Sequence, residues 1–105
     1  MNARALLVEL AACTGSSSLR GVRLVLSFVE HSFATERLGP VDELLRLIEP
    51  DGLSMRVLLA LVRCTYRMRG NLLYYDYALE KVRQHLVNTG QPESFLHGLP
   101  YKTVS

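Results

Sequence analysis

Two segments of this 105-residue chain are apolar on nearly every side of a helix, and this feature restricts the chain to folds in which helices pack closely. In residues 19–35, a helical wheel of about 100° per residue gathers most of the polar side chains into one sector, made by Arg20, Arg23, Ser27, Glu30 and His31. In residues 53–69, the stripe opposite the apolar side chains is made by Arg56, Ala60, Arg63 and Arg67. A helix that is apolar almost all round belongs inside a bundle, so we predict that both helices are central.

Three further segments show apolar residues at steps of three and four, which is the helical period. Glycine and proline separate the segments, and no stretch alternates as a strand would. The sequence therefore predicts an all-α fold, a compact single domain over residues 1–105. Its expected parts are about five helices, a short C-terminal turn and a tail, with the helices at approximately 2–13, 19–35, 40–48, 53–69 and 73–89.

The ends of these helices carry recognisable capping residues. Asn2 is a candidate N-cap, a serine within 16–18 is another, and either Asp51 or Ser54 suits the fourth helix. Pro40 fits the first turn of the third helix. Gly70 and Gly90 suit the ends of the last two helices, because glycine adopts the left-handed conformation that often follows a helix.

The charge of the chain is small. Twelve Lys and Arg oppose ten Asp and Glu, which leaves a formal net charge of +2 and a pI near 8.7. A dedicated nucleic-acid-binding domain usually has a pI above about 9 and a concentrated basic surface, so this balance disfavours that class. Ten of the twelve basic residues are arginines, which suits specific contacts, although a high-GC genome gives the same bias.

The cysteines and the apolar runs indicate a cytoplasmic protein. Cys13 and Cys64 lie in apolar helical patterns without metal-ligand spacing, so two free buried thiols are expected, with a disulfide as the alternative. Residues 10–13 resemble a lipoprotein cleavage box, but Glu9 interrupts the short apolar stretch before it. No run approaches the roughly 20 apolar residues of a transmembrane helix, so we expect no membrane association.

No residue pattern predicts catalysis, a cofactor, a metal or a small-molecule ligand. Ser27 and His31 are neighbours on a helix face beside Glu30, but a polar stripe is also simply the solvent edge of a helix. The histidines at 31, 85 and 97 form no metal-binding pair, and the glycines form no phosphate-binding run.

The joint between the fourth and fifth helices is the strongest candidate for a contact with a partner. It is rich in arginine and tyrosine, which dominate binding hot spots. The candidate contact residues are Arg63, Arg67, Arg69, Tyr74 and Tyr77. In the alternative interpretation, Tyr75 fills the core, Tyr74 and Tyr77 rim it, and the arginines solvate the helix end.

The preferred function is a small protein–protein interaction module, either a homodimer or a subunit, adaptor or inhibitor of another protein. Two nearly all-apolar helices are more than a small bundle needs at its centre, and a symmetric partner would cover the second one. The alternative is a nucleic-acid-binding regulator that uses the arginine stripe of the fourth helix. An enzyme with an unrecognised site comes third.

Overall fold

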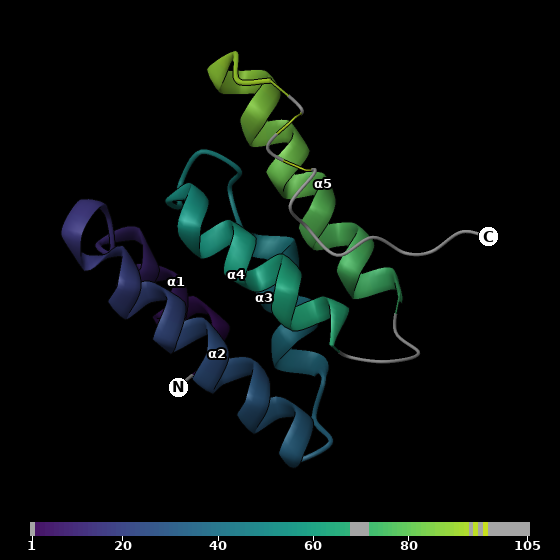
Figure 1. Cartoon of the computed structure of the whole chain (residues 1–105). Coiled ribbons are helices and arrows are strands. Elements are labelled where there is room, and N and C mark those ends of the chain that lie inside the picture. The colour runs from purple at the N-terminus through teal and green to yellow at the C-terminus, as the bar shows by residue number, and fades with distance from the viewer. Residues whose placement is uncertain (1, 68–71, 93, 95, 97–105) are drawn as a thin grey trace.

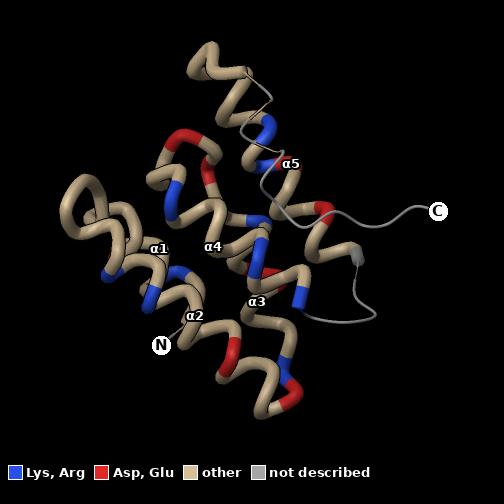
Figure 2. Tube along the Cα trace, in the orientation of Figure 1, with Lys and Arg blue, Asp and Glu red and all other residues tan. Residues whose placement is uncertain are grey.

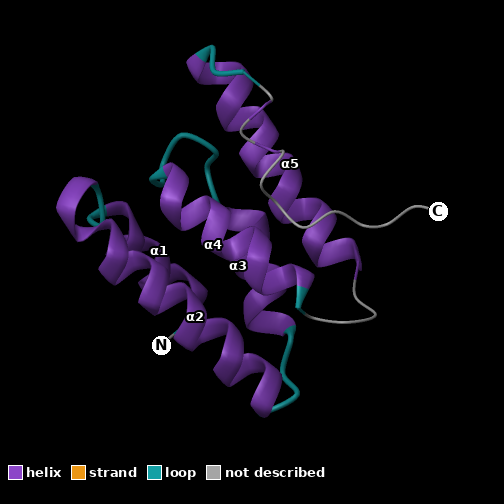
Figure 3. Cartoon of the chain, viewed as in Figure 1, coloured by secondary structure: helices purple, strands orange, loops and turns teal. Residues whose placement is uncertain are grey.

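The residues that the structure describes form five α-helices, as the spacing of the apolar residues predicts (Figures 1 and 3). A computed structural model describes residues 2–67, 72–92, 94 and 96, and these residues contain no strand. The helices are α1 (Ala3–Ala11), α2 (Ser18–Ala34), α3 (Gly39–Leu47), α4 (Met55–Tyr66) and α5 (Leu72–Thr89), with a short 3-10 turn, η1 (Gly15–Ser17), before α2. The all-α prediction is confirmed.

Polar side chains start two of the helices where the sequence places them. The Asn2 side chain accepts a hydrogen bond from the Ala5 amide at 2.8 Å and caps α1. Ser54 accepts one from the Val57 amide at 3.3 Å and caps α4, so Ser54 and not Asp51 is the cap. Because Ser54 is the cap, α4 begins at Met55 and not at residue 53, and Leu53 before the cap is buried.

The start of α2 differs from the prediction. Ser17 occupies the N-cap position, but its side chain makes no capping hydrogen bond. Its hydroxyl donates to the Thr14 carbonyl at 2.8 Å, which ties the 3-10 turn together. Gly15 opens this turn with a φ of +56°, the left-handed conformation that glycine adopts readily. The expected stop at Gly70 lies outside the described residues.

The helices form two layers (Figure 1). The helix α4 lies between α2 and α5 in one layer, and α1 and α3 pack against each other behind it. The molecule measures 38 × 37 × 20 Å, and the shortest dimension matches two helices of about 10 Å diameter. All five helices contribute to one core. Its largest fully buried side chains include Leu6, Leu10, Val25, Leu44, Leu45, Leu58, Leu61, Tyr75 and Leu86.

The two helices that were both expected at the centre of the fold occupy different positions. The prediction is right for α4, in which seven of the twelve residues are buried and two neighbours flank the helix. It is wrong for α2, which lies at the outer edge of its layer (Figure 1). Leu19 is 49% exposed and Phe33 is 46% exposed, because α4 and the second layer cover only one side of α2.

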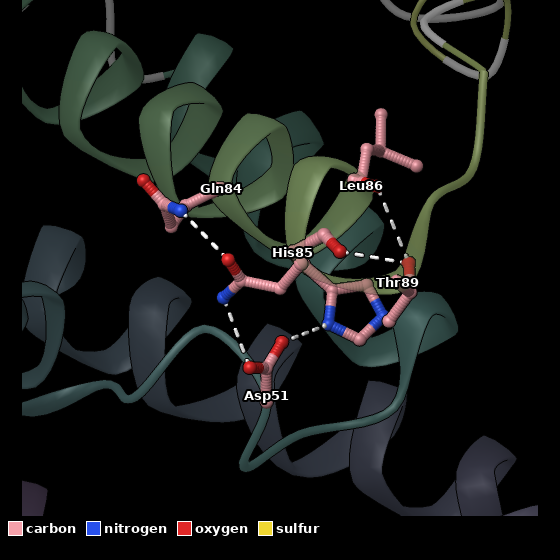
Figure 4. A network of polar contacts seen from close by, with 6 residues as sticks. Asp51, Gln84, His85, Leu86 and Thr89 are labelled. Atoms are coloured by element: carbon pink, nitrogen blue, oxygen red, sulfur yellow. Dashed lines mark hydrogen bonds and ion pairs between the residues drawn. The ribbon is translucent and has the colours of Figure 1, made fainter.

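The turn between α3 and α4 is held by the polar edge of α5 (Figure 4). Asp51 accepts a hydrogen bond from the Asn88 side chain at 2.9 Å, and its other oxygen lies 3.1 Å from Nδ1 of His85. Gln84 donates to the side-chain oxygen of Asn88 at 2.8 Å, and Lys81 donates to the backbone carbonyl of Ile48 at 2.9 Å. The contacts of Asp51 with His85 and Asn88, and of Lys81 with Ile48, join segments more than 30 residues apart.

Candidate interaction surface

A row of apolar side chains runs along the uncovered side of α2. It consists of Leu19, Leu26 and Phe33, which are spaced seven residues apart, and we call it the α2 row. A seven-residue step is nearly two helical turns, so the three side chains project from the same side. Leu19 and Phe33 are each about half exposed, and Leu26 is half-buried. The α2 row is therefore an apolar strip that the described helices leave partly open.

The α2 row borders a hollow between α2 and the end of α4. The hollow has a volume of about 420 Å³, and its lining consists of Leu26, Val29, Glu30, Phe33, Ala34, Cys64 and Arg67. Most of this lining is apolar, and the two charged residues have opposite signs. We call it the α2–α4 hollow. A volume of this size lies within the usual range of ligand pockets, about 300–1,000 Å³.

The charged residues around this surface lack partners in the described part of the chain. Glu30 and Arg67 are exposed and form no salt bridge there, and the same holds for Arg23 on α2. By contrast, Arg20 on the same helix is 2.9 Å from a carboxylate oxygen of Glu9. Figure 2 marks the basic and acidic positions along α2. The surface thus offers one unpaired charge of each sign on α2.

Cys64 lies in the wall of the hollow as a neutral thiol. Burial raises the pKa of Cys64 to about 11, an effect that the positive charge of Arg67 opposes and the negative charge of Glu30 reinforces. A thiol with this pKa is almost wholly protonated at neutral pH, and the thiolate is the nucleophilic form. Cys13 is also buried, and both cysteines are free, so the expected free buried thiols are confirmed.

The structure divides the predicted contact residues into two groups. Arg63 is exposed on α4, and Arg67 lies at the α2–α4 hollow. Tyr77, which is 37% exposed, lies between α3 and α5 beside Arg46. Arg69 lies outside the described residues.

Tyr74 belongs to the α3 side with Tyr77. It is half-buried, and its pKa is raised first by burial and then by the nearby Asp42. Asp42 in turn accepts a hydrogen bond from Arg46 at 2.8 Å. Tyr75 is 1% exposed and its ring meets that of Tyr66 edge-on at 5.5 Å, so the expectation that Tyr75 fills the core is confirmed.

Sequence reasoning missed the α2 row. The wheel of α2 showed only that apolar residues occupy most sides of the helix, and coverage by neighbours is not visible on a wheel. The seven-residue spacing of Leu19, Leu26 and Phe33 was the available signal, because such spacing is typical of helices that pack along a seam.

The remaining candidates for chemistry do not gather at this surface. Ser27 and His31 are both exposed on α2, and neither lines the α2–α4 hollow. Within the described ranges, no group of three His, Cys, Asp or Glu side chains could hold a metal ion. None of the helices in those ranges combines the length and the apolar character needed to cross a membrane.

Comparison of the chain with models of protein families, with curated proteins and with solved structures finds no match.

Proposed function

We propose that this protein is a helical protein–protein interaction module that binds through the α2 row and the α2–α4 hollow. The observation that carries the proposal is the half exposure of Leu19 and Phe33 in the α2 row, of which Phe33 and Leu26 also line the apolar hollow. Fully burying one large apolar side chain is worth about 1.5–3 kcal/mol, so a partner that covered the exposed halves would gain roughly half of that at each residue. An apolar centre with charges at its rim is the usual anatomy of an interface.

The two free cysteines agree with a reducing compartment such as the cytoplasm, where thiols stay reduced. Because the α2 row and the lining of the hollow are mainly apolar, the partner would be a protein with a complementary apolar surface. The aromatic ring of Phe33 is the natural anchor, since aromatic side chains are enriched at interfaces.

Capture of partners from a lysate of the cells that make this protein tests the proposal. The immobilised chain should retain a partner, and Phe33→Asp should abolish the retention because a carboxylate would enter the apolar contact. The matched control is Val8→Asp, which alters an apolar residue that is 74% exposed on α1, away from the hollow. Equal retention by both variants, with helical content unchanged, would contradict the proposal.

A second candidate function rests on the outer face of α4. Arg56, Arg63 and Arg67 are exposed there without a salt bridge in the described part of the chain, and Tyr66 is 42% exposed near them in sequence. Unpaired arginines bind phosphates, and an exposed tyrosine can stack on a base.

A gel shift with single- and double-stranded oligonucleotides at two salt concentrations tests this candidate. Affinity should fall as salt rises, and the double variant Arg63→Ala/Arg67→Ala should weaken binding about tenfold or more. Arg83→Ala, an exposed arginine of α5, is the control. The absence of salt-dependent binding in both pools would eliminate nucleic acid as the partner.

A further inference from the structure

We infer that the occupant of this surface is a second copy of the chain, bound with the two α2 helices antiparallel. This inference rests on the proposed function and names the partner. The evidence is the order of apolar and charged residues on either side of Leu26. Two copies of α2 bring complementary residues opposite each other only when they run antiparallel.

The apolar part of this arrangement is symmetric about Leu26. Leu19 lies seven residues before Leu26 and Phe33 lies seven residues after it, so each is about 10.5 Å from Leu26 along the helix. When two α2 helices pair antiparallel around their Leu26 residues, Leu19 of each copy faces Phe33 of the other. Phe33 also lines the α2–α4 hollow, so Leu19 of the second copy arrives at the edge of an apolar space.

The charges decide the direction of the pairing. Arg23 lies three residues before Leu26 and Glu30 lies four residues after it, both exposed on the flank that faces away from the core. In the antiparallel pair, Arg23 of each copy meets Glu30 of the other with an offset of about one residue, or roughly 1.5 Å. In a parallel pair in register, the two-fold axis runs along the helices and places this flank of each copy on opposite sides of the seam, so the Arg23–Glu30 contacts between copies do not form.

These two charges are free to take part. Arg20, which also lies on α2, is held by Glu9, whereas Arg23 and Glu30 form no salt bridge among the described residues. A two-fold axis through the centre of the pair produces both Arg23–Glu30 contacts at once. Self-matching of this kind is what an isologous dimer requires.

Sedimentation equilibrium over a range of concentrations tests the inference, with charge reversals as the probe. The natural chain should dimerise, and Arg23→Glu or Glu30→Arg alone should each weaken the dimer about tenfold, since each turns two attractive pairs into repulsive ones. An equimolar mixture of the two variants should recover the affinity, because both cross-copy contacts then join opposite charges. Arg83→Glu on α5 should leave the affinity unchanged.

The outcomes separate this inference from the proposed function. A natural chain that stays monomeric at all concentrations, or a mixture that dimerises no better than the single variants, overturns the antiparallel dimer. If the monomeric chain still captures a partner through Phe33, the proposed function stands without the dimer. A dimer that survives Phe33→Asp is formed through another surface and also overturns the antiparallel α2 pair.

Discussion

Gly21 brings α2 close to its neighbours. A Cβ atom at this position would lie 2.8 Å from Cγ2 of Val57 on α4 and 2.9 Å from Cβ of Cys13. Both distances are shorter than real Cβ contacts, and neither atom is the end of a long flexible side chain. The lack of a side chain at Gly21 therefore permits the close packing of α2 with α4.

Gly21→Ala should lower the free energy of unfolding by up to about 2 kcal/mol, because an overpacking cost of roughly 1–3 kcal/mol is offset by a gain in helix propensity of only about 1 kcal/mol. Urea unfolding measures the change. Ser27→Ala, at an exposed position of the same helix, is the control and should change the free energy by less than about 0.5 kcal/mol. A more stable Gly21→Ala variant would contradict this, because it would show that α2 can move away from Val57 and Cys13 without an energetic cost.

Glu36 adopts a backbone conformation that favours glycine. Its φ is +56°, and it follows α2 in a turn where the Arg37 amide donates to the Ser32 carbonyl at 2.9 Å. The end of α5 has the same turn, with Gly90 at a φ of +68° and the Gln91 amide bonded to the Leu86 carbonyl at 2.9 Å. The two helix ends therefore differ in the residue that occupies the left-handed position.

Glu36→Gly should raise the free energy of unfolding by about 0.5–1 kcal/mol, since a left-handed conformation costs an L-residue roughly 1–2 kcal/mol, partly offset by the flexibility of glycine when unfolded. Gly90→Ala should lower it by a similar amount. Thermal and urea unfolding of the two variants provide the comparison. Changes of the same sign in both variants would contradict this interpretation.

At the scale of elements, the link between α5 and the α3–α4 turn depends on Asp51. Its two oxygens contact His85 and Asn88, and the side chain of His85 is only 13% exposed (Figure 4). Removing the carboxylate would leave these two groups without their partner in the turn. The turn would then be held to α5 by Lys81 and by apolar contacts.

Asp51→Ala should lower the free energy of unfolding by about 1 kcal/mol, the usual net contribution of a hydrogen bond. Glu49→Ala is the matched control, because Glu49 is an exposed acid of the same turn whose carboxylate forms no salt bridge in the described part of the chain. Amide hydrogen exchange of residues 49–53 should increase in the Asp51 variant only. Equal effects of the two substitutions would indicate a general charge effect.

At the scale of the whole molecule, stability should depend on the protonation of Cys64. Its pKa is about 11 in the folded chain and 9.0 for an unperturbed thiol. Between these values the unfolded chain releases a proton that the folded chain keeps, so the free energy of unfolding falls as pH rises. The contribution of the neutral thiol is complete below pH 9 and is lost by about pH 11.

The expected loss between pH 8 and pH 10.5 is about 1–2 kcal/mol, less than the full shift implies because Cys64 borders an open hollow. Tyrosines and lysines also titrate in this range, so the measurement compares the natural chain with Cys64→Ala. The natural chain should lose more stability than the variant over this interval. Parallel pH profiles would show that the thiol is not the cause.

The positions of the helices follow from local features of the sequence. Apolar residues at helical spacing, Asn2 and Ser54 as caps, Pro40 in a first turn and Gly90 after a last turn act within a few residues of one another. The burial of Tyr75 and of both cysteines follows from the same patterns. Local chemistry was therefore sufficient to predict the five helices and most of their ends.

The candidate surface depended on the tertiary structure, because burial is decided by what packs against a helix. The wheels of α2 and α4 look alike, yet α4 has a helix on each side and α2 does not. Likewise, Arg67 and Tyr74 are near in sequence, but α4 brings one to α2 and α5 brings the other to α3. The sequence by itself determined which residues form helices, and the packing of those helices determined that the α2 row is the strip left open.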